Sequence, residues 1–219
     1  MQHKSPLRQA DTPPRVTDGR KLNAEATQAA LRAAGRQLFG QLGFEATALG
    51  ELCRMAGVTT GAIYHHFGDK KGLFAAVAEE LDAGLVKLAT QTRDRALASG
   101  ADAWGAFLAA VDAFLQAGQD VQARRIGLID APAVLGTQGW LDIRERQGLG
   151  AMMQTVGQLQ ALEILLPGDT RLRARVILGL LYGATEALAD DPRDATLALQ
   201  DTRALLHAML AGLRAPPSL

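Results

Sequence analysis

Hydrogen-bonding side chains are concentrated in one short segment, residues 59–67, whose sequence is TTGAIYHHF. Ile63 and Phe67 lie one helical turn apart, which predicts a short helix with one buried face. The rest of this helix would carry hydroxyl, phenol and imidazole groups, which can donate to phosphate oxygens and to base edges. The segment therefore favours a nucleic-acid interface over a surface used only for packing.

The residues before this segment predict the element that must position it. Apolar side chains recur at the i, i+3, i+4 and i+7 positions of a short helix, namely Leu49, Leu52, Cys53 and Ala56. Gly57 is suited to end that helix, and Thr59 is suited to cap the next one. Two short helices joined by a tight glycine turn are the means by which proteins place a second helix in the DNA major groove.

The stretch from about Thr27 to Leu81 resembles the N-terminal DNA-binding domain of the TetR family of bacterial transcriptional regulators. The shared pattern consists of Phe39, Gly43-Phe44, Ala46-Thr47, Leu52, Ala56-Gly57-Val58, Gly61, Ile63-Tyr64, Phe67, Lys70 and Leu73. Two residues depart from it: His66 stands where a second aromatic is usual, and Cys53 where Ala is usual. The resemblance implies an all-α protein with a three-helix helix-turn-helix domain, followed by a helical regulatory and dimerisation domain.

Base-reading candidates lie at the exposed start of the second short helix: Thr60, Gly61, Ala62 and His65. Predicted phosphate contacts are Thr47, Tyr64 and Lys70, which the resemblance supports, and Thr59 completes the predicted DNA-binding set. The segment 60–67 contains no Arg or Lys, so the commonest contact to guanine is missing. We expect light direct readout, supplemented by DNA shape or by an N-terminal arm.

Other chemistry is poorly supported by the sequence. His65 and His66 point about 100° apart on a helix, so they cannot hold one metal ion together. Cys53 falls on the apolar face of its helix and is expected to be buried. We find no nucleophile–base pair, phosphate-binding glycine loop or metal-ligand set. We expect no enzymatic activity, no cofactor and no metal.

Composition agrees with an all-α protein. The 219 residues are 48 % hydrophobic but only 5 % aromatic, and they contain a single cysteine, which fits a reducing cytoplasm. No apolar run approaches the length of about 20 residues needed for a membrane span, and we expect neither a signal peptide nor a membrane partner. Residues 1–71 contain 10 Lys and Arg against 6 Asp and Glu, a net +4 in a chain of net charge zero. This basic surplus lies on the expected DNA-binding end.

The apolar periodicity predicts about nine helices. They are expected at about 23–42, 48–56, 60–66, 70–99, 102–117, 119–130, 140–163, 169–189 and 193–213. Asn23 is the expected cap of the first, and a Pro/Gly-rich joint is expected at 130–140. The predicted division is a flexible basic arm at 1–22, a DNA-binding domain at 23–71, and an effector-binding and dimerisation domain at 72–219.

The resemblance also implies a cavity for a small effector in the C-terminal domain. Its candidate lining residues are Trp104, Phe107, Val111, Phe114, Trp140, Met152, Met153 and Tyr182. Methionine adapts to irregular ligands and the tyrosine offers a polar group. Ordinary core packing is the alternative interpretation of these side chains.

Small and apolar residues near the end of the chain predict a homodimer interface. The candidates are Val176, Gly179, Leu180, Gly183, Ala187, Leu206, Met209, Leu210 and Leu213. Two such helices per subunit would form a four-helix bundle about a two-fold axis. The leading hypothesis is therefore a homodimeric repressor that binds a palindromic double-stranded operator and is released by a small, mostly apolar effector. The alternatives are an architectural DNA binder without effector, or a helical small-molecule-binding protein with weak DNA recognition.

Overall fold

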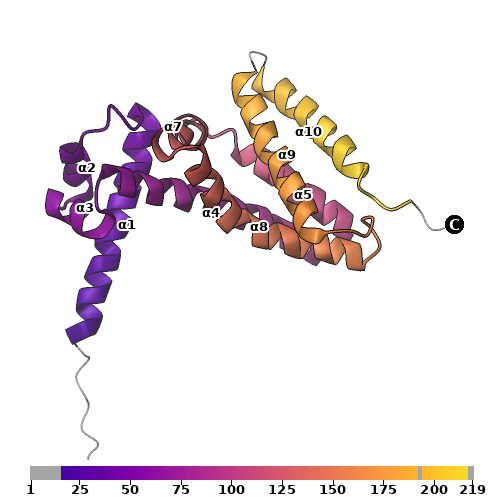
Figure 1. Ribbon diagram of the computed structural model, residues 1–219, viewed down its shortest axis with the longest axis horizontal. Helices are drawn as coiled ribbons and strands as arrows, with labels where there is room; N and C mark the ends of the chain where they lie inside the picture. Colours follow the sequence, from indigo (N-terminus) through magenta and orange to yellow (C-terminus); the bar gives the residue numbers. More distant parts are fainter. Residues whose placement is uncertain (1–15, 192–193, 217–219) are drawn as a thin grey trace, which may run out of the picture.

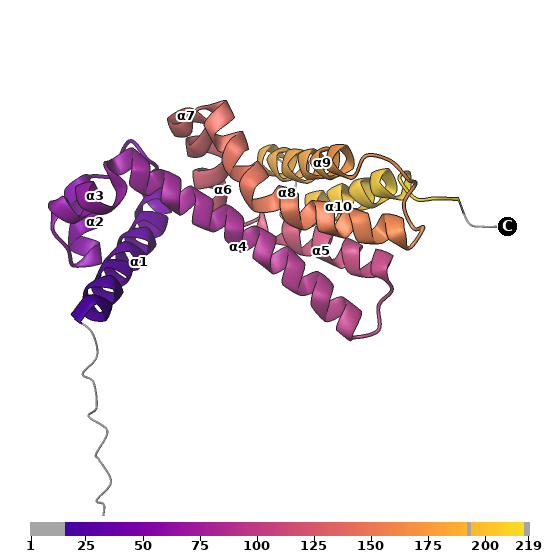
Figure 2. The same ribbon diagram turned by 60° about the horizontal axis from the view of Figure 1, so that its bottom comes forward.

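The computed structural model describes residues 16–191 and 194–216, and these form an all-helical molecule of two parts (Figure 1). The head contains α1 (Val16–Leu42), α2 (Leu49–Ala56) and α3 (Thr60–Phe67). The single long helix α4 (Lys70–Ala98) starts in the head and runs into the second part, as Figure 2 shows. Helix α4, which the sequence predicts at about 70–99, thus connects the two parts.

The second part contains the residues expected to form the regulatory domain, and we use that name for it. Its elements are α5 (Ala103–Ala117), α6 (Val121–Arg124), the π-helix η1 (Arg125–Asp130), α7 (Ala131–Leu135), α8 (Thr137–Ala161), α9 (Thr170–Asp190) and α10 (Ala195–Ala211). Because α6, η1 and α7 follow one another without a gap, the described part of the chain contains nine helical stretches, as predicted. A loop was expected around 130–140, but helix continues to Leu135 and Gly136 alone, with φ 79°, makes the break.

Helix α1 begins earlier than predicted. It is already helical at Val16, so Asn23 lies inside the helix and does not cap it. The predicted flexible arm at 1–22 is therefore wrong for residues 16–22, and residues 1–15 lie outside the described residues.

Aspartate side chains cap most of the long helices. Asp69 accepts a hydrogen bond from the N–H of Gly72 at the start of α4, and Asp102 does the same from Gly105 at α5. Asp120, Asp169 and Asp194 cap α6, α9 and α10. Such caps satisfy backbone donors that have no partner within the helix, and they fix where each helix starts.

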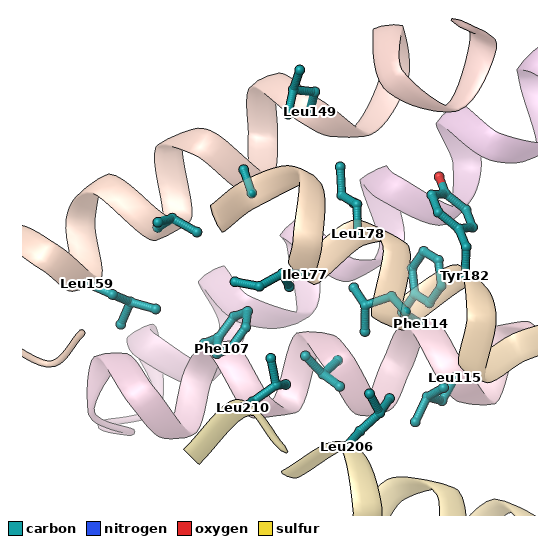
Figure 3. Close-up of a cluster of buried hydrophobic side chains, with 14 of the residues drawn as sticks. Phe107, Phe114, Leu115, Leu149, Leu159, Ile177, Leu178, Tyr182, Leu206 and Leu210 are labelled. Atoms are coloured by element: carbon teal, nitrogen blue, oxygen red, sulfur yellow. The ribbon is translucent and has the colours of Figure 1, made fainter. Parts of the chain in front are cut away.

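Two hydrophobic cores hold the two parts. The head core centres on Phe39 and Phe74, both fully buried, and extends to Ile126 and Trp140 of the regulatory domain. The second core joins α5, α8, α9 and α10, and Figure 3 shows Phe107, Phe114 and Tyr182 within it. Since Ile126 and Trp140 belong to the head core, the two parts are packed against each other rather than joined by α4 alone.

Candidate nucleic-acid interface and ligand pocket

Helix α3 is fixed by its buried face and presents the opposite face to solvent. Ile63 is fully buried, whereas Tyr64 is 55 % exposed and Thr60, Gly61 and His65 are also exposed. The turn before α3 rests on Gly57, whose left-handed φ of 67° favours glycine. The predicted base-reading residues are thus on the surface, except that Ala62 packs partly against the head core.

The starts of α2 and α3 differ from those of the Asp-capped helices. Ala48 occupies the N-cap position of α2, and no side chain caps that helix. Thr59 is the N-cap residue of α3, as predicted, but its side chain makes no capping hydrogen bond. The first N–H groups of both helices are therefore free to bind an anion such as a DNA phosphate.

Thr47 has a structural role instead of the predicted phosphate contact. It is 2 % exposed, and its hydroxyl donates to the carbonyl oxygen of Gly43 at 2.7 Å. The single proton of this hydroxyl is used inside the head, so the prediction that Thr47 binds phosphate is wrong in this structure.

Lys70 supports the loop between α1 and α2. Its Nζ donates to the carbonyl oxygens of Phe44 at 2.9 Å and Thr47 at 3.1 Å, and it lies 4.3 Å from the centre of the Phe44 ring. Two of its three donors are therefore used within the protein. The phosphate contact of Lys70 stays a prediction, with one donor left to make it.

The two adjacent histidines have different surroundings. His66 lies 3.4 Å from the amide nitrogen of Gln28 on α1, measured from Nδ1, and so links α3 to α1. His65 is exposed on the other side, with its ring centre 4.7 Å from that of His66. Within the described residues, no group of three His, Cys, Asp or Glu side chains is placed to hold a metal ion. Cys53 is buried, as predicted.

The predicted effector residues do not line one cavity. Phe107, Val111, Phe114 and Met152 line a cavity of about 60 Å³. Trp140 and Tyr182 line a different, more spacious pocket of about 470 Å³, which we call the α4–α9 pocket. Trp104 and Met153 instead pack against the regulatory core. The predicted residues therefore do not share a single cavity, and of the two cavities that they line the α4–α9 pocket is the one with room for a small molecule.

A buried polar cluster, which the sequence analysis missed, forms one wall of the α4–α9 pocket. The hydroxyl of Tyr182 donates to Oδ1 of Asp82 at 2.8 Å. The Arg144 guanidinium lies 4.1 Å from the Tyr182 ring centre and 4.8 Å from that of Trp140, and its Nη1 pairs with Glu186 at 3.1 Å. Asp82 could have been singled out from the sequence, because this acidic residue directly follows Leu81 of the apolar stripe of α4 and so falls at a position expected to be buried.

Burial sets the protonation behaviour of this cluster. It raises the pKa of the Asp82 carboxyl, while the Tyr182 hydrogen bond and the Arg144 charge act in the opposite direction. The pKa of Tyr182 is also raised, by burial and by the neighbouring Asp82. Tyr182 therefore remains a hydrogen-bond donor at neutral pH.

The wall of the α4–α9 pocket is joined to the head. Arg124, Gly127 and Leu128 of α6 and η1 line the pocket. Between them, Arg125 donates to the carbonyl oxygens of Gln41 at 3.2 Å and Leu42 at 2.9 Å, at the end of α1. Helix η1 is thus hydrogen-bonded directly to the head.

The predicted dimer residues fall into two groups. Val176, Gly179, Gly183, Ala187 and Met209 are exposed on α9 and α10. Leu180 and Leu213 pack partly against the regulatory core. Leu206 and Leu210 are buried within that core, 3 % and 0 % exposed (Figure 3), so their assignment to an interface is wrong.

Further apolar side chains extend the exposed group of α9 and α10. They are Leu172, Leu197 and Leu205, each more than half exposed. Together with Val176, Gly179, Gly183, Ala187 and Met209, they form what we call the α9–α10 face. An exposed apolar face of this kind marks an interaction surface.

Taken together, the exposed α3, the uncapped helix starts and the separate helical domain define a helix-turn-helix DNA-binding protein. Residues 31–77 match the family described as bacterial regulatory proteins, tetR family, and residues 104–213 match the tetracyclin repressor-like C-terminal domain. A TetR-family transcriptional regulator from Pectobacterium atrosepticum is 31 % identical in sequence and has a TM-score of 0.75. That similarity covers 90 % of this chain and 99 % of the other. The chain belongs to the TetR family of DNA-binding transcriptional regulators, which are not enzymes.

Two curated relatives match in the head. The HTH-type transcriptional regulator AcrR of Shigella flexneri is 40 % identical over 68 residues, 31 % of this chain and 32 % of AcrR. The HTH-type transcriptional repressor AcnR of Corynebacterium glutamicum is 38 % identical over 56 residues, 26 % of this chain and 30 % of AcnR. These matches span about a third of the length of the relatives, so the shared part is the DNA-binding part. No helix among the described residues is long and apolar enough to cross a membrane.

Proposed function

We propose that the protein is a homodimeric, cytoplasmic repressor that binds a palindromic operator and is released by a small, mostly apolar effector. The observation that carries the DNA-binding part is the exposed face of α3 beside two helix starts that no side chain caps. Free N–H groups at a helix start favour phosphates, and Tyr64 and His65 can reach phosphates or base edges from the same face.

The α9–α10 face supports the proposed homodimer. Gly179 and Gly183 let a second helix approach closely, while Leu172, Val176 and Met209 supply apolar area on either side. Pairing this face with its copy about a two-fold axis would present two α3 helices to one side of the DNA. Their half-sites would then lie about 34–36 Å apart, or a multiple of that spacing.

The α4–α9 pocket supports an effector and disfavours an effector-free architectural role. Its volume of about 470 Å³ is within the usual range for small-molecule sites. It is bounded both by α4, which carries the head, and by η1, which binds the end of α1. An effector that fits the pocket better in one arrangement of these elements would shift the head, and linkage requires operator DNA to weaken effector binding by the same factor.

The experiment that tests the proposal is operator binding over a salt series. DNA from the region upstream of the protein's own coding sequence is titrated with wild type, Tyr64→Phe, Tyr64→Ala and His65→Ala. Steep salt dependence, with weaker binding by both alanine variants, is the expected outcome. The matched control is Lys87→Ala, an exposed residue of α4 outside the head, which should leave the affinity unchanged. Binding no tighter than to competitor DNA, with all variants alike, would move the helical ligand-binding alternative to the front.

A further inference from the structure

Helix η1 is wider than an α-helix, and this width decides which of its side chains face the head. The N–H of Ala131 donates to the carbonyl oxygen of Ile126, five residues earlier, which is the hydrogen bond that defines a π-helix. Such a bond places residues i and i+5 about one turn apart, on the same side of the helix. In an α-helix, with about 3.6 residues per turn, the same two residues point about 140° apart. Residues five apart can therefore share a contact surface in η1 that an α-helix would not give them.

Two pairs of residues five apart use this geometry to hold the head. Arg125 donates to the carbonyl oxygens at the end of α1, and Asp130 accepts from the N–H of Phe44, just beyond that end. Ile126 and Ala131 are both fully buried in the head core. In the π register all four side chains lie on the head side of η1, so all four contacts depend on the one wide turn.

Pro132 gives a physical reason for the wide turn. It is the second residue of α7 and has no N–H to donate. In a continuous α-helix its ring would clash with the carbonyl oxygen of Leu128, four residues earlier, which disfavours that register by a factor on the order of 10². A wider turn directly before the proline relieves this clash and loses no hydrogen bond that Pro132 could have made. The sequence therefore biases η1 toward the π register.

The α register would have a buried residue of its own. Ile129 is 66 % exposed although its side chain is large and apolar. Since residues i and i+4 share a face in an α-helix, Ile129 would replace Asp130 beside Arg125 on the head side. Asp130 and Ala131 would turn away from the head. The second register therefore exchanges one hydrogen bond and a buried alanine for a buried isoleucine.

We propose that η1 is a two-register switch: the π register holds the head through Arg125 and Asp130 together, and the α register releases Asp130 and lets the head move. Gly127 and Leu128 of the same segment line the α4–α9 pocket. A molecule in the pocket meets a different wall in each register and stabilises the register that it fits better. This regulatory consequence rests on the proposed function, whereas the two registers are measurable without DNA and without an effector.

The test is amide hydrogen exchange of the full chain, followed residue by residue by NMR. The reporter is the N–H of Phe44, which the π register bonds to Asp130. Pro132→Ala removes the clash and supplies an N–H for the α register, so we expect the Phe44 N–H to exchange at least about tenfold faster. Pro167→Ala, at an exposed position between α8 and α9, is the matched control and should leave this rate unchanged.

Two double variants and one internal reference separate a register change from loosening of the whole fold. With Asp130→Ala the Phe44 N–H has already lost its acceptor, so adding Pro132→Ala should change its exchange rate by less than about twofold. Ile129→Ser withdraws the side chain that the α register buries, so adding it to Pro132→Ala should return the rate to within about threefold of wild type. The N–H of Leu210, in the regulatory core, should exchange at the wild-type rate throughout.

The switch is overturned by an unchanged Phe44 rate in Pro132→Ala, or by an equal acceleration at Leu210. It is also overturned if Pro132→Ala accelerates Phe44 exchange fully in the Asp130→Ala background, or if Ile129→Ser restores nothing. Operator titration of wild type is carried out on the same preparation. A failure there would remove the proposed function and leave the register result standing.

Discussion

The carboxylate of Asp130 accepts a hydrogen bond from the backbone N–H of Phe44 at 2.8 Å, across 86 residues of sequence. Asp130 ends η1, and Phe44 follows the glycine that ends α1, so this bond joins the pocket wall to the head. The Phe44 ring in turn packs edge-on against Phe74 of α4, with centres 5.2 Å apart. The turn at Phe44 is therefore held from the regulatory domain and from α4 together.

Removing the Asp130–Phe44 hydrogen bond should reduce the coupling between effector binding and operator binding more than it reduces stability. In Asp130→Ala the N–H of Phe44 loses its partner, and we expect a loss of about 1–2 kcal/mol in the free energy of unfolding by urea. The ratio of effector affinities with and without operator should move toward one. Asp130→Asn retains an acceptor and should restore most of that ratio, whereas an unchanged ratio in Asp130→Ala would show that η1 does not carry the signal.

Tyr64 should matter for DNA and not for stability. Because its side chain is 55 % exposed, Tyr64→Ala should change the free energy of unfolding by less than about 0.5 kcal/mol. Loss of a hydrogen bond to a charged phosphate should lower operator affinity about tenfold. Fluorescence anisotropy measures the affinity and urea unfolding measures the stability. A parallel loss of both would assign Tyr64 to packing.

Two glycines of α4 should respond in opposite directions to alanine. A Cβ at Gly72 would lie 1.9 Å from the carbonyl oxygen of Phe67, so Gly72→Ala must separate α3 from α4 and should abolish operator binding. A Cβ at Gly84 meets no atom within 4 Å, so Gly84→Ala should stabilise the protein by about 1 kcal/mol. Thermal unfolding of both variants measures the change in stability, and operator titration of the same proteins measures the change in DNA affinity. Equal stabilities would contradict the packing of α4 described above.

The buried carboxyl of Asp82 should make stability depend on pH. Burial raises its folded-state pKa above the ordinary value of 3.8. Its stabilising contribution is then fully present below that value and is lost as the pH rises through the folded-state pKa. Asp82→Asn, which stays neutral, should therefore exceed wild type in stability at pH 7, and the difference should shrink toward pH 4.5. Urea unfolding across this range is the measurement, and a difference independent of pH would mean that Asp82 does not titrate as described.

The α9–α10 face predicts the oligomeric state. Val176 is 52 % exposed, so Val176→Glu should leave the protomer folded while placing a charge in the proposed interface. We expect sedimentation velocity to show a dimer for wild type and a monomer for the variant. Leu97→Glu, at a 43 % exposed position of α4, is the matched control and should remain dimeric. A wild-type monomer at micromolar concentration would remove the two-headed mode of binding.

Local signals in the sequence were enough to predict the helix order. Gly57 ends α2 as predicted, and α4, bounded by Asp69 and Ser99, starts and ends within a residue of the predicted 70–99, because such caps act through their own backbone neighbours. The start of α1 could not be found in this way, because Asn23 has a side chain suited to capping but lies inside the helix, which begins at Val16. The continuation of helix through Pro132 was missed for a related reason: a proline near the start of a helix costs no hydrogen bond.

The site was less accessible to sequence reasoning because its contacts are long-range. Thr47 was assigned to DNA from its position, but only the structure shows its hydroxyl bonded to Gly43. Trp140 and Tyr182 both line the α4–α9 pocket, yet the partners of Tyr182, Asp82 and Arg144, lie 100 and 38 residues from it in the chain. Leu206 and Met209 look alike in sequence, and only the packing of α10 on α5 separates the core side from the exposed side.

Because α4 is one unbroken helix, a small tilt at the pocket becomes a larger displacement at its head end. From Asp82 to Lys70 it extends about 18 Å at 1.5 Å per residue, so a tilt of about 5° at the pocket displaces the attached head by about 1.6 Å. In a two-fold dimer the heads swing in opposite directions, and their separation changes by about 3 Å, close to the rise of one base pair. If the proposed effector tilted α4 by this amount in the proposed dimer, both α3 helices would move out of register with the grooves they face.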